Sequence, residues 1–186
     1  MNTGDGFMTL GLAFSRDRAM QLDGTLKSFF LHCRDADEVR LFVIYKTTGD
    51  LHALQYARLV REYSQVSFIN ETNFRQNVLE VLIAYGTGRA VGIVCRAVIR
   101  LGARFGRLNN LRPTLDRPRY VLFLSDDNIF VRDFRMCDVC EALDTRREAL
   151  GFSLRLGTNT TYCYPLDRAQ TPPPFTRFEN HVMEFD

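Results

Sequence analysis

The chain has 186 residues, which is enough for one domain with its own core and short for two. Hydrophobic residues make up 46% of the chain and charged residues 25%, as in ordinary globular proteins, and a net charge of +2 argues against a dedicated nucleic-acid-binding protein. The first residues lack the basic and apolar regions of a secretory signal, and no run approaches the roughly 20 apolar residues of a membrane span, so we expect a cytoplasmic protein.

Apolar runs with two different periods alternate along the first 70 residues. Residues 9–14 are predicted to form a buried strand, and helix 19–32 follows it, with an apolar face made of Met20, Leu22, Leu26, Phe29 and Phe30. A second strand is predicted at 39–45, a third at 66–69, and between them lies a helix at 52–63 whose core candidates are Leu51, Leu54, Leu59 and Val60. This alternation is typical of right-handed βαβ units and predicts an α/β fold with a mostly parallel sheet flanked by helices.

Three further elements are predicted after residue 119. The unbroken apolar run 120–124 is typical of a central strand that is covered on both faces. Residues 131–143 are predicted to form a helix with Phe134, Val139, Leu143 and Met136 facing inward. Residues 151–156 alternate apolar and polar side chains, which favours a strand near the edge of a sheet.

The segment 75–119 is strongly basic: it holds nine arginines and only two acidic residues, Glu80 and Asp116. On a helical projection of 89–107 the arginines fall on one side and apolar residues on the other. One interpretation is a helix packed on the sheet with its arginines in solvent. The other is a peripheral contact of the 89–107 helix with anionic headgroups at the inner face of a membrane.

The cysteines and histidines do not point to a metal or disulfide framework. Five cysteines at irregular spacings favour reduced thiols, and the Cys137-x-x-Cys140 pair has no second pair and no nearby histidine to complete four zinc ligands. The three histidines are scattered along the chain.

The strongest functional signal is an acid motif, Asp126-Asp127-Asn128, that follows the strand 120–124 after a single serine. The carboxyl end of a parallel strand is where open α/β sheets bind ligands. Mg²⁺ and Mn²⁺ prefer oxygen ligands and are commonly held by one or two carboxylates together with substrate phosphates. The alternative is structural: Asp126 starts a turn, and Asp127 or Asn128 caps the following helix.

Two segments together resemble the nucleotide-binding part of a GT-A glycosyltransferase, and family 2 and its relatives most closely. They are Phe14-Ser15-Arg16-Asp17-Arg18, with the helix after it, and the segment 123–130 around the acid motif. The resemblance implies a GT-A-like domain that moves a sugar from a nucleoside-diphosphate sugar to a hydroxyl acceptor, which would be a glycan, a lipid or a protein. It implies the following site residues: Phe14, Ser15 and Arg16 in the nucleotide-binding loop, Asp126 as a ribose or sugar contact, and Asp127 with Asn128 as ligands of Mn²⁺ or Mg²⁺.

The chain departs from that family in two ways. The segment 75–119 is longer than expected, so we describe the chain as one domain, 1–186, with a basic helical insertion at about 75–119. No carboxylate base can be assigned, because the late acids Glu179, Glu184 and Asp186 lie in no pattern that marks one, and they are interpreted as solvated tail charges. We therefore expect the acceptor-binding part to be missing or to lie in a continuation beyond Asp186.

Two other interpretations of the whole chain remain open. In the first, the chain is a nucleotide-binding or membrane-docking module without catalysis of its own. In the second, it is a phosphotransfer domain with Asp126 as the nucleophile. The second of these needs a lysine or a further acid after a later strand, and the two lysines, Lys27 and Lys46, come too early. In addition, residues 162–166, with two tyrosines, line an acceptor or sugar pocket, or else pack locally beside the prolines.

Overall fold

The computed structural model describes residues 9–85, 118–154, 161–171, 174–179 and 182–185. Contacts within the chain divide it into two compact units, Met1–Cys137 and Asp138–Asp186, and each is described by itself. The predicted helix 89–107 lies outside the described residues. The start of the basic segment, however, belongs to a regular helix, α3 (Phe74–Tyr85).

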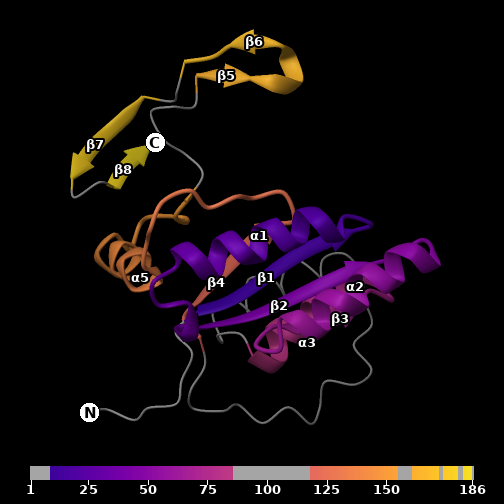
Figure 1. Ribbon diagram of the computed structural model, residues 1–186. Helices are drawn as coiled ribbons and strands as arrows, with labels where there is room; N and C mark the ends of the chain where they lie inside the picture. Colours follow the sequence, from indigo (N-terminus) through magenta and orange to yellow (C-terminus); the bar gives the residue numbers. More distant parts are fainter. Residues whose placement is uncertain (1–8, 86–117, 155–160, 172–173, 180–181, 186) are drawn as a thin grey trace. The chain divides into compact units, whose positions relative to one another are not determined.

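The first unit is built on a four-stranded parallel sheet (Figure 1). Its strands are β1 (Thr9–Arg16), β2 (Val39–Lys46), β3 (Ser67–Asn70) and β4 (Tyr120–Ser125), in the order β3-β2-β1-β4. Helix α1 (Ala19–His32), the short 3₁₀ helix η1 (Ala36–Glu38) and helix α2 (Asp50–Glu62) connect the first three strands. The α/β fold with a parallel sheet is thus confirmed. The strand order reverses at β1, so a topological switch point lies between β1 and β4.

Side chains of β1 and β2 alternate between two packed faces. On one face Leu10 and Leu12 pack with Phe42 and Ile44 against Val81 and Leu82, two buried residues of α3. Helices α1 and α2 contact each other and cover the other face, as right-handed crossovers require (Figure 1). Their largest fully buried side chains are Leu22, Leu26, Phe29 and Tyr56. The two central strands are therefore covered on both sides.

The predicted apolar faces of the two helices were correct in part. Leu22, Leu26 and Phe29 are buried as expected, but Met20 is 80% exposed. On α2 only Leu59 of the predicted set is buried, while Leu51 and Leu54 are 68% and 69% exposed. The core contact of α2 is made instead by Tyr56, whose ring is buried and whose hydroxyl forms hydrogen bonds.

The prediction that β4 is a central strand was wrong for the described sheet. There β4 pairs with β1 alone, so it forms an edge. Leu124 is buried at 4% exposure, whereas Phe123 is 58% exposed. Of the six residues of β4, Leu124 alone is buried, so the unbroken apolar run does not mark a strand that is covered on both faces.

The predicted helix 131–143 begins later than expected, at Met136, and α5 runs over Met136–Thr145. Residues 128–135, before it, form no helix and are attached to the end of α1 at Phe134. Phe134 forms a β-bridge with Cys33, through hydrogen bonds of 3.0 Å from Phe134 N to His32 O and from Arg34 N to Phe134 O. Phe134 also packs on Phe29, with ring centroids 6.2 Å apart. Together with the two backbone hydrogen bonds, this contact stabilises the observed conformation over a helical one.

The second unit contains two small antiparallel hairpins. Strands β5 (Tyr162–Cys163) and β6 (Arg168–Ala169) flank the 3₁₀ helix η3 (Tyr164–Leu166), and β7 (Phe175–Glu179) pairs with β8 (Val182–Phe185). The predicted strand at 151–156 is wrong for residues 151–154, which form no strand, and 155–156 lie outside the described residues. Glu184 is an ion-pair partner of Arg146 rather than a free tail charge, which corrects its predicted role.

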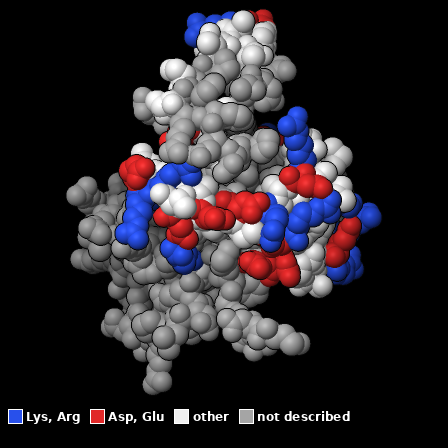
Figure 2. All heavy atoms as spheres, turned by 90° about the vertical axis from the view of Figure 1, so that its left-hand side faces the viewer, with Lys and Arg blue, Asp and Glu red and all other residues white. Residues whose placement is uncertain are grey.

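Charges of both signs are interspersed on the described surface. Figure 2 shows Lys and Arg side chains alternating with Asp and Glu side chains over one face of the molecule. Several are paired, for example Arg34 with Asp133 and Lys27 with Asp23. Among the described helices, none has the length and hydropathy needed to cross a membrane.

Candidate functional site

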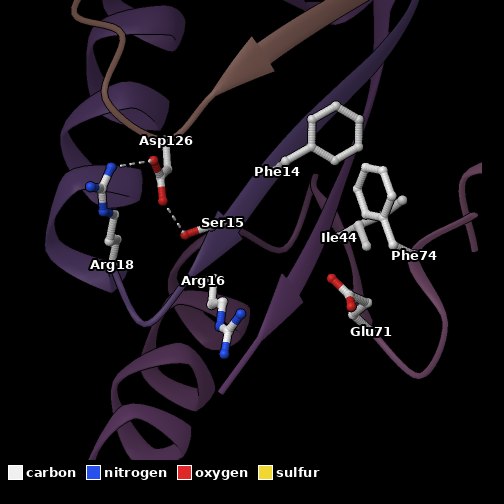
Figure 3. Close-up of a pocket in the computed structure, with 8 residues that line it drawn as sticks. All are labelled: Phe14, Ser15, Arg16, Arg18, Ile44, Glu71, Phe74 and Asp126. Atoms are coloured by element: carbon white, nitrogen blue, oxygen red, sulfur yellow. Dashed lines mark hydrogen bonds and ion pairs between the residues drawn. The ribbon is translucent and has the colours of Figure 1, made fainter. Parts of the chain in front are cut away.

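A pocket of about 340 Å³ opens at the carboxyl end of the parallel sheet, beside the switch point (Figure 3). The end of β1 and the loop after it, the strand β2, the β3–α3 loop and the end of β4 all contribute to its wall. The lining residues are Phe14, Ser15, Arg16, Arg18, Ile44, Glu71, Phe74 and Asp126. The structure thus brings together all four residues that were predicted to bind a nucleotide sugar, Phe14, Ser15, Arg16 and Asp126.

Asp126 is the buried acid of this pocket, with 6% exposure. The Ser15 hydroxyl donates a hydrogen bond of 2.9 Å to its Oδ2, and the Arg18 guanidinium lies 3.5 Å from its Oδ1. A buried carboxylate needs such partners because removing it from water is costly. Asp126 is therefore held in one orientation, while the Arg18 side chain remains 54% exposed and faces solvent at the pocket.

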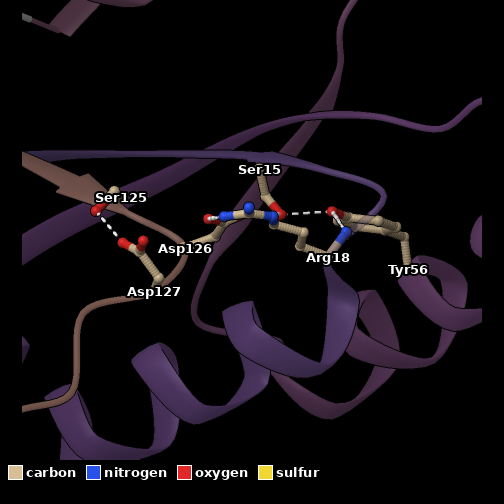
Figure 4. A network of polar contacts seen from close by, with 6 residues as sticks. All are labelled: Ser15, Arg18, Tyr56, Ser125, Asp126 and Asp127. Carbon is tan, nitrogen blue, oxygen red and sulfur yellow. Dashed lines mark hydrogen bonds and ion pairs between the residues drawn. The ribbon is translucent and has the colours of Figure 1, made fainter. Parts of the chain in front are cut away.

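A chain of hydrogen bonds continues from Asp126 to helix α2 (Figure 4). Ser15 uses its single hydroxyl proton on Asp126, so its oxygen accepts from the Tyr56 hydroxyl. The Tyr56 oxygen in turn accepts from the backbone N–H of Arg18 at 3.2 Å. Burial raises the pKa of Tyr56, so the phenol keeps its proton at neutral pH. The chain runs in one direction, from an amide through two hydroxyls to a carboxylate.

Asp127 and Asn128 follow in a turn that is closed by a 3.4 Å hydrogen bond from Asn128 N to Ser125 O. Asp127 is exposed, and its Oδ1 accepts a 2.6 Å hydrogen bond from the Ser125 hydroxyl. Neither residue is among those that line the pocket. The structural alternative was right about the turn and wrong about the cap, because α5 begins at Met136 and is capped by Asp35.

The acid motif can supply part of a metal site. Among the described residues, no group of three or more His, Cys, Asp or Glu side chains is arranged to hold an ion. Asp127 and Asn128 nevertheless offer a carboxylate and an amide oxygen on adjacent residues. Such a partial set fits Mg²⁺ or Mn²⁺ where substrate phosphates and water complete the shell.

Two lining residues that were not predicted come from the β3–α3 loop and the first residue of α3: Glu71 and Phe74. The Asn77 side chain fixes this loop by accepting hydrogen bonds from Thr72 N at 3.1 Å and Asn73 N at 3.3 Å. Asn73 then caps α3 by accepting from Gln76 N at 3.1 Å. The sequence offered one indication of these two lining residues, their position just after a predicted strand. Because β3 ends at the same edge of the sheet as β1 and β4, the residues that follow it lie near the site.

Asp17 joins the loop after β1 to the loop after β2. It adopts a left-handed conformation with φ of 56°, and its carboxylate accepts hydrogen bonds from the Thr48 amide at 2.8 Å and the Thr48 hydroxyl at 2.9 Å. The amide hydrogen bond is the main cause of the lowered pKa of Asp17. This contact holds the predicted nucleotide-binding loop in place.

The chain is related in sequence to a glycosyltransferase. It is 25% identical over 168 residues to the bifunctional glycosyltransferase pgtA of Dictyostelium discoideum, in an alignment that covers 87% of this chain and 18% of that protein. The chain therefore spans less than a fifth of the length of this relative. No protein-family model matches the chain, and no solved structure matches it.

Proposed function

We propose that this chain binds a nucleoside-diphosphate sugar in the pocket at the end of the sheet and takes part in moving the sugar to a hydroxyl acceptor. One observation carries the proposal: the loop after β1 and the acid at the end of β4 line the same pocket at a topological switch point. The sequence similarity to a glycosyltransferase supports the same reaction class.

The lining residues suit the parts of such a donor. The exposed ring of Phe74 offers a face for a nucleobase. Asp126, held by Ser15 and Arg18, suits a ribose or sugar hydroxyl, because a carboxylate accepts hydrogen bonds from hydroxyl groups. The cationic side chains of Arg16 and Arg18 suit the diphosphate.

Asp127 and Asn128 would hold Mn²⁺ or Mg²⁺ together with the donor's diphosphate. When bound, the metal neutralises the charge of the departing diphosphate. Arg18 adds a cationic side chain to the pocket, 3.5 Å from Asp126 (Figure 3). The acceptor is proposed only as a hydroxyl compound, a glycan, lipid or protein. A membrane contact through residues 89–107 stays a prediction, since they lie outside the described residues.

The test is calorimetry of the full chain with Mn²⁺ and a panel of nucleoside diphosphates. The wild type is expected to bind at least one of them, and Asp127→Asn is expected to weaken the Mn²⁺-dependent binding about tenfold or more. Asp37→Asn is the matched control, because Asp37 is an exposed aspartate just before β2, at the end of the sheet where the strands begin and away from the pocket. This variant should bind like the wild type.

Two results would count against the proposal. The absence of heat with every nucleotide would remove the nucleotide site, and equal binding by Asp127→Asn would remove the metal assignment. Nucleotide binding without hydrolysis or transfer from the matching nucleotide sugar would instead favour a binding module without catalysis.

A further inference from the structure

The loop after β3 and the first residue of α3 place a carboxylate and an aromatic ring on one side of the pocket. Glu71 and Phe74 both line it, and Figure 3 shows them on the side opposite Asp126 and Arg18. The proposed function assigns Asp126 to a ribose or sugar hydroxyl and Arg18 to the diphosphate, and it gives Glu71 no role.

Glu71 is fixed at its backbone and at one carboxylate oxygen. Its N–H donates a 2.7 Å hydrogen bond to Tyr45 O at the end of β2. The Lys46 ammonium lies 3.4 Å from Oε1, and the side chain is 20% exposed. In the described part of the chain, Lys46 is the one group paired with this carboxylate, which leaves Oε2 to accept a hydrogen bond from a ligand.

Phe74 lies three residues further on and is 46% exposed. Its ring meets Phe14 edge to face, with centroids 5.2 Å apart and an interplanar angle of 60°. Phe14 thereby supports the Phe74 ring from the side of β1. A planar base that stacks on Phe74 would place its hydrogen-bonding edge near the Glu71 carboxylate.

Charge decides which part of a nucleotide fits beside Glu71. A carboxylate repels a diphosphate, so the phosphates belong on the side of Arg18, away from Glu71. The neutral parts can approach a carboxylate: the ribose and the sugar, one of whose hydroxyls the proposed function places at Asp126, and the base, which is left for Glu71. Of the groups on a base, the carboxylate can use only hydrogen-bond donors, because it has none of its own.

We propose that Glu71 selects the base of the donor nucleotide, favouring a base with an N–H in the ring on its pairing edge, which means uracil or guanine. This inference rests on the proposed function. Uracil N3 and guanine N1 carry a hydrogen that Oε2 can accept. Cytosine N3 and adenine N1 instead present a lone pair beside the donor amino group, and that lone pair would face the carboxylate. A site built to accept a hydrogen bond from the ring nitrogen disfavours a base that lacks the donor there.

The experiment compares UDP, GDP, CDP and ADP by calorimetry on the full chain with Mn²⁺. These ligands share the ribose and the diphosphate and differ only in the base. The wild type is expected to bind UDP or GDP about tenfold or more tightly than CDP and ADP, as one charge-assisted hydrogen bond allows. The comparison of UDP with GDP tells which of the two bases is preferred.

In Glu71→Gln the difference in affinity between these two pairs of nucleotides is expected to fall below about threefold, because a glutamine amide can also donate to cytosine N3 or adenine N1. Glu71→Asp keeps the charge but shortens the side chain, and should narrow the gap as well. Glu38→Gln is the control, since Glu38 is exposed and directly precedes β2 at the far edge of the sheet. Thermal unfolding of each variant checks that it is folded.

A wild type without preference among the four nucleotides would overturn the inference, and so would a Glu71→Gln variant that weakens all four equally. The latter result would place Glu71 at the ribose or in a purely structural ion pair with Lys46. A wild type that binds none of the four nucleotides contradicts the proposed function itself and is therefore a distinguishable outcome.

Discussion

Tyr56 is the residue that connects helix α2 to the buried acid of the pocket. Its hydroxyl donates to Ser15 and accepts from Arg18 N. Tyr56→Phe removes one oxygen and leaves two buried or partly buried groups without their partner, which costs about 1–3 kcal/mol of unfolding free energy. We also expect weaker nucleoside diphosphate binding, because Ser15 loses the contact that orients it toward Asp126. Chemical denaturation and calorimetry measure the two effects.

Tyr63→Phe is a matched control for that prediction. Tyr63 follows α2 directly, is buried, and donates a 2.6 Å hydrogen bond to Asp23, away from the pocket. Its loss should lower stability without changing nucleotide affinity. If both variants lose affinity equally, the effect of Tyr56→Phe comes from general destabilisation and not from the orientation of Asp126.

The hydrogen-bonded residues Ser15, Tyr56 and Asp126 show how much of the site could be predicted from the sequence. Ser15 and Asp126 were visible because each ends an apolar run, and the ends of parallel strands meet at one edge of the sheet. Tyr56 was not visible, since it lies 41 residues from Ser15 and no local pattern connects them. Glu71 was missed for a related reason: its place in the pocket depends on the parallel pairing of β3 with β2, which brings the end of β3 to the edge where β1 and β4 end.

Asp35 holds the beginning of α5 and makes its stability depend on pH. Its carboxylate accepts hydrogen bonds from Met136 N at 2.8 Å and Cys137 N at 2.9 Å. Burial alone would raise the pKa of Asp35, but these hydrogen bonds outweigh it and lower the pKa below its ordinary value of 3.8. The contribution is therefore present above that value and is lost as the pH falls through the lowered pKa.

We predict that Asp35→Asn lowers the unfolding free energy by about 0.5–2 kcal/mol at pH 7, the range found for helix caps. An asparagine keeps only one acceptor oxygen for the two amides. The difference from the wild type should shrink as the pH is lowered below 3.8, because the wild-type carboxylate then loses its charge. Denaturation curves at several pH values measure this, and a difference that does not change with pH would contradict it.

The same region shows why helix boundaries were harder to predict than the sheet. Phe130 and Phe134 are four residues apart, a spacing that fits one face of a helix. In the structure both rings pack on Phe29 of α1, at 5.6 and 6.2 Å between centroids, from a segment that is not helical. Tertiary contacts with residues about 100 positions earlier decide the conformation. The strands of the sheet, by contrast, carried their signal in continuous apolar runs.

The pocket and the late acids belong to different units of the chain. All eight lining residues lie between positions 14 and 126, within the first unit. The second unit holds Glu184, whose carboxylate pairs with Arg146 and whose side chain is 31% exposed. The ion pair thus connects β8 to the residue that follows α5, inside the second unit.

We therefore predict that Glu184→Gln leaves nucleoside diphosphate affinity unchanged within about twofold. The variant should increase hydrogen exchange in β7 and β8, because the ion pair that attaches this hairpin is weakened; a partly exposed pair of this kind contributes about 1 kcal/mol or less. Calorimetry and hydrogen exchange on the same sample test both statements. Weaker nucleotide binding by this variant would show that the second unit supports the donor site, contrary to the prediction. Unchanged binding with loss of sugar transfer would instead assign Glu184 to the transfer step.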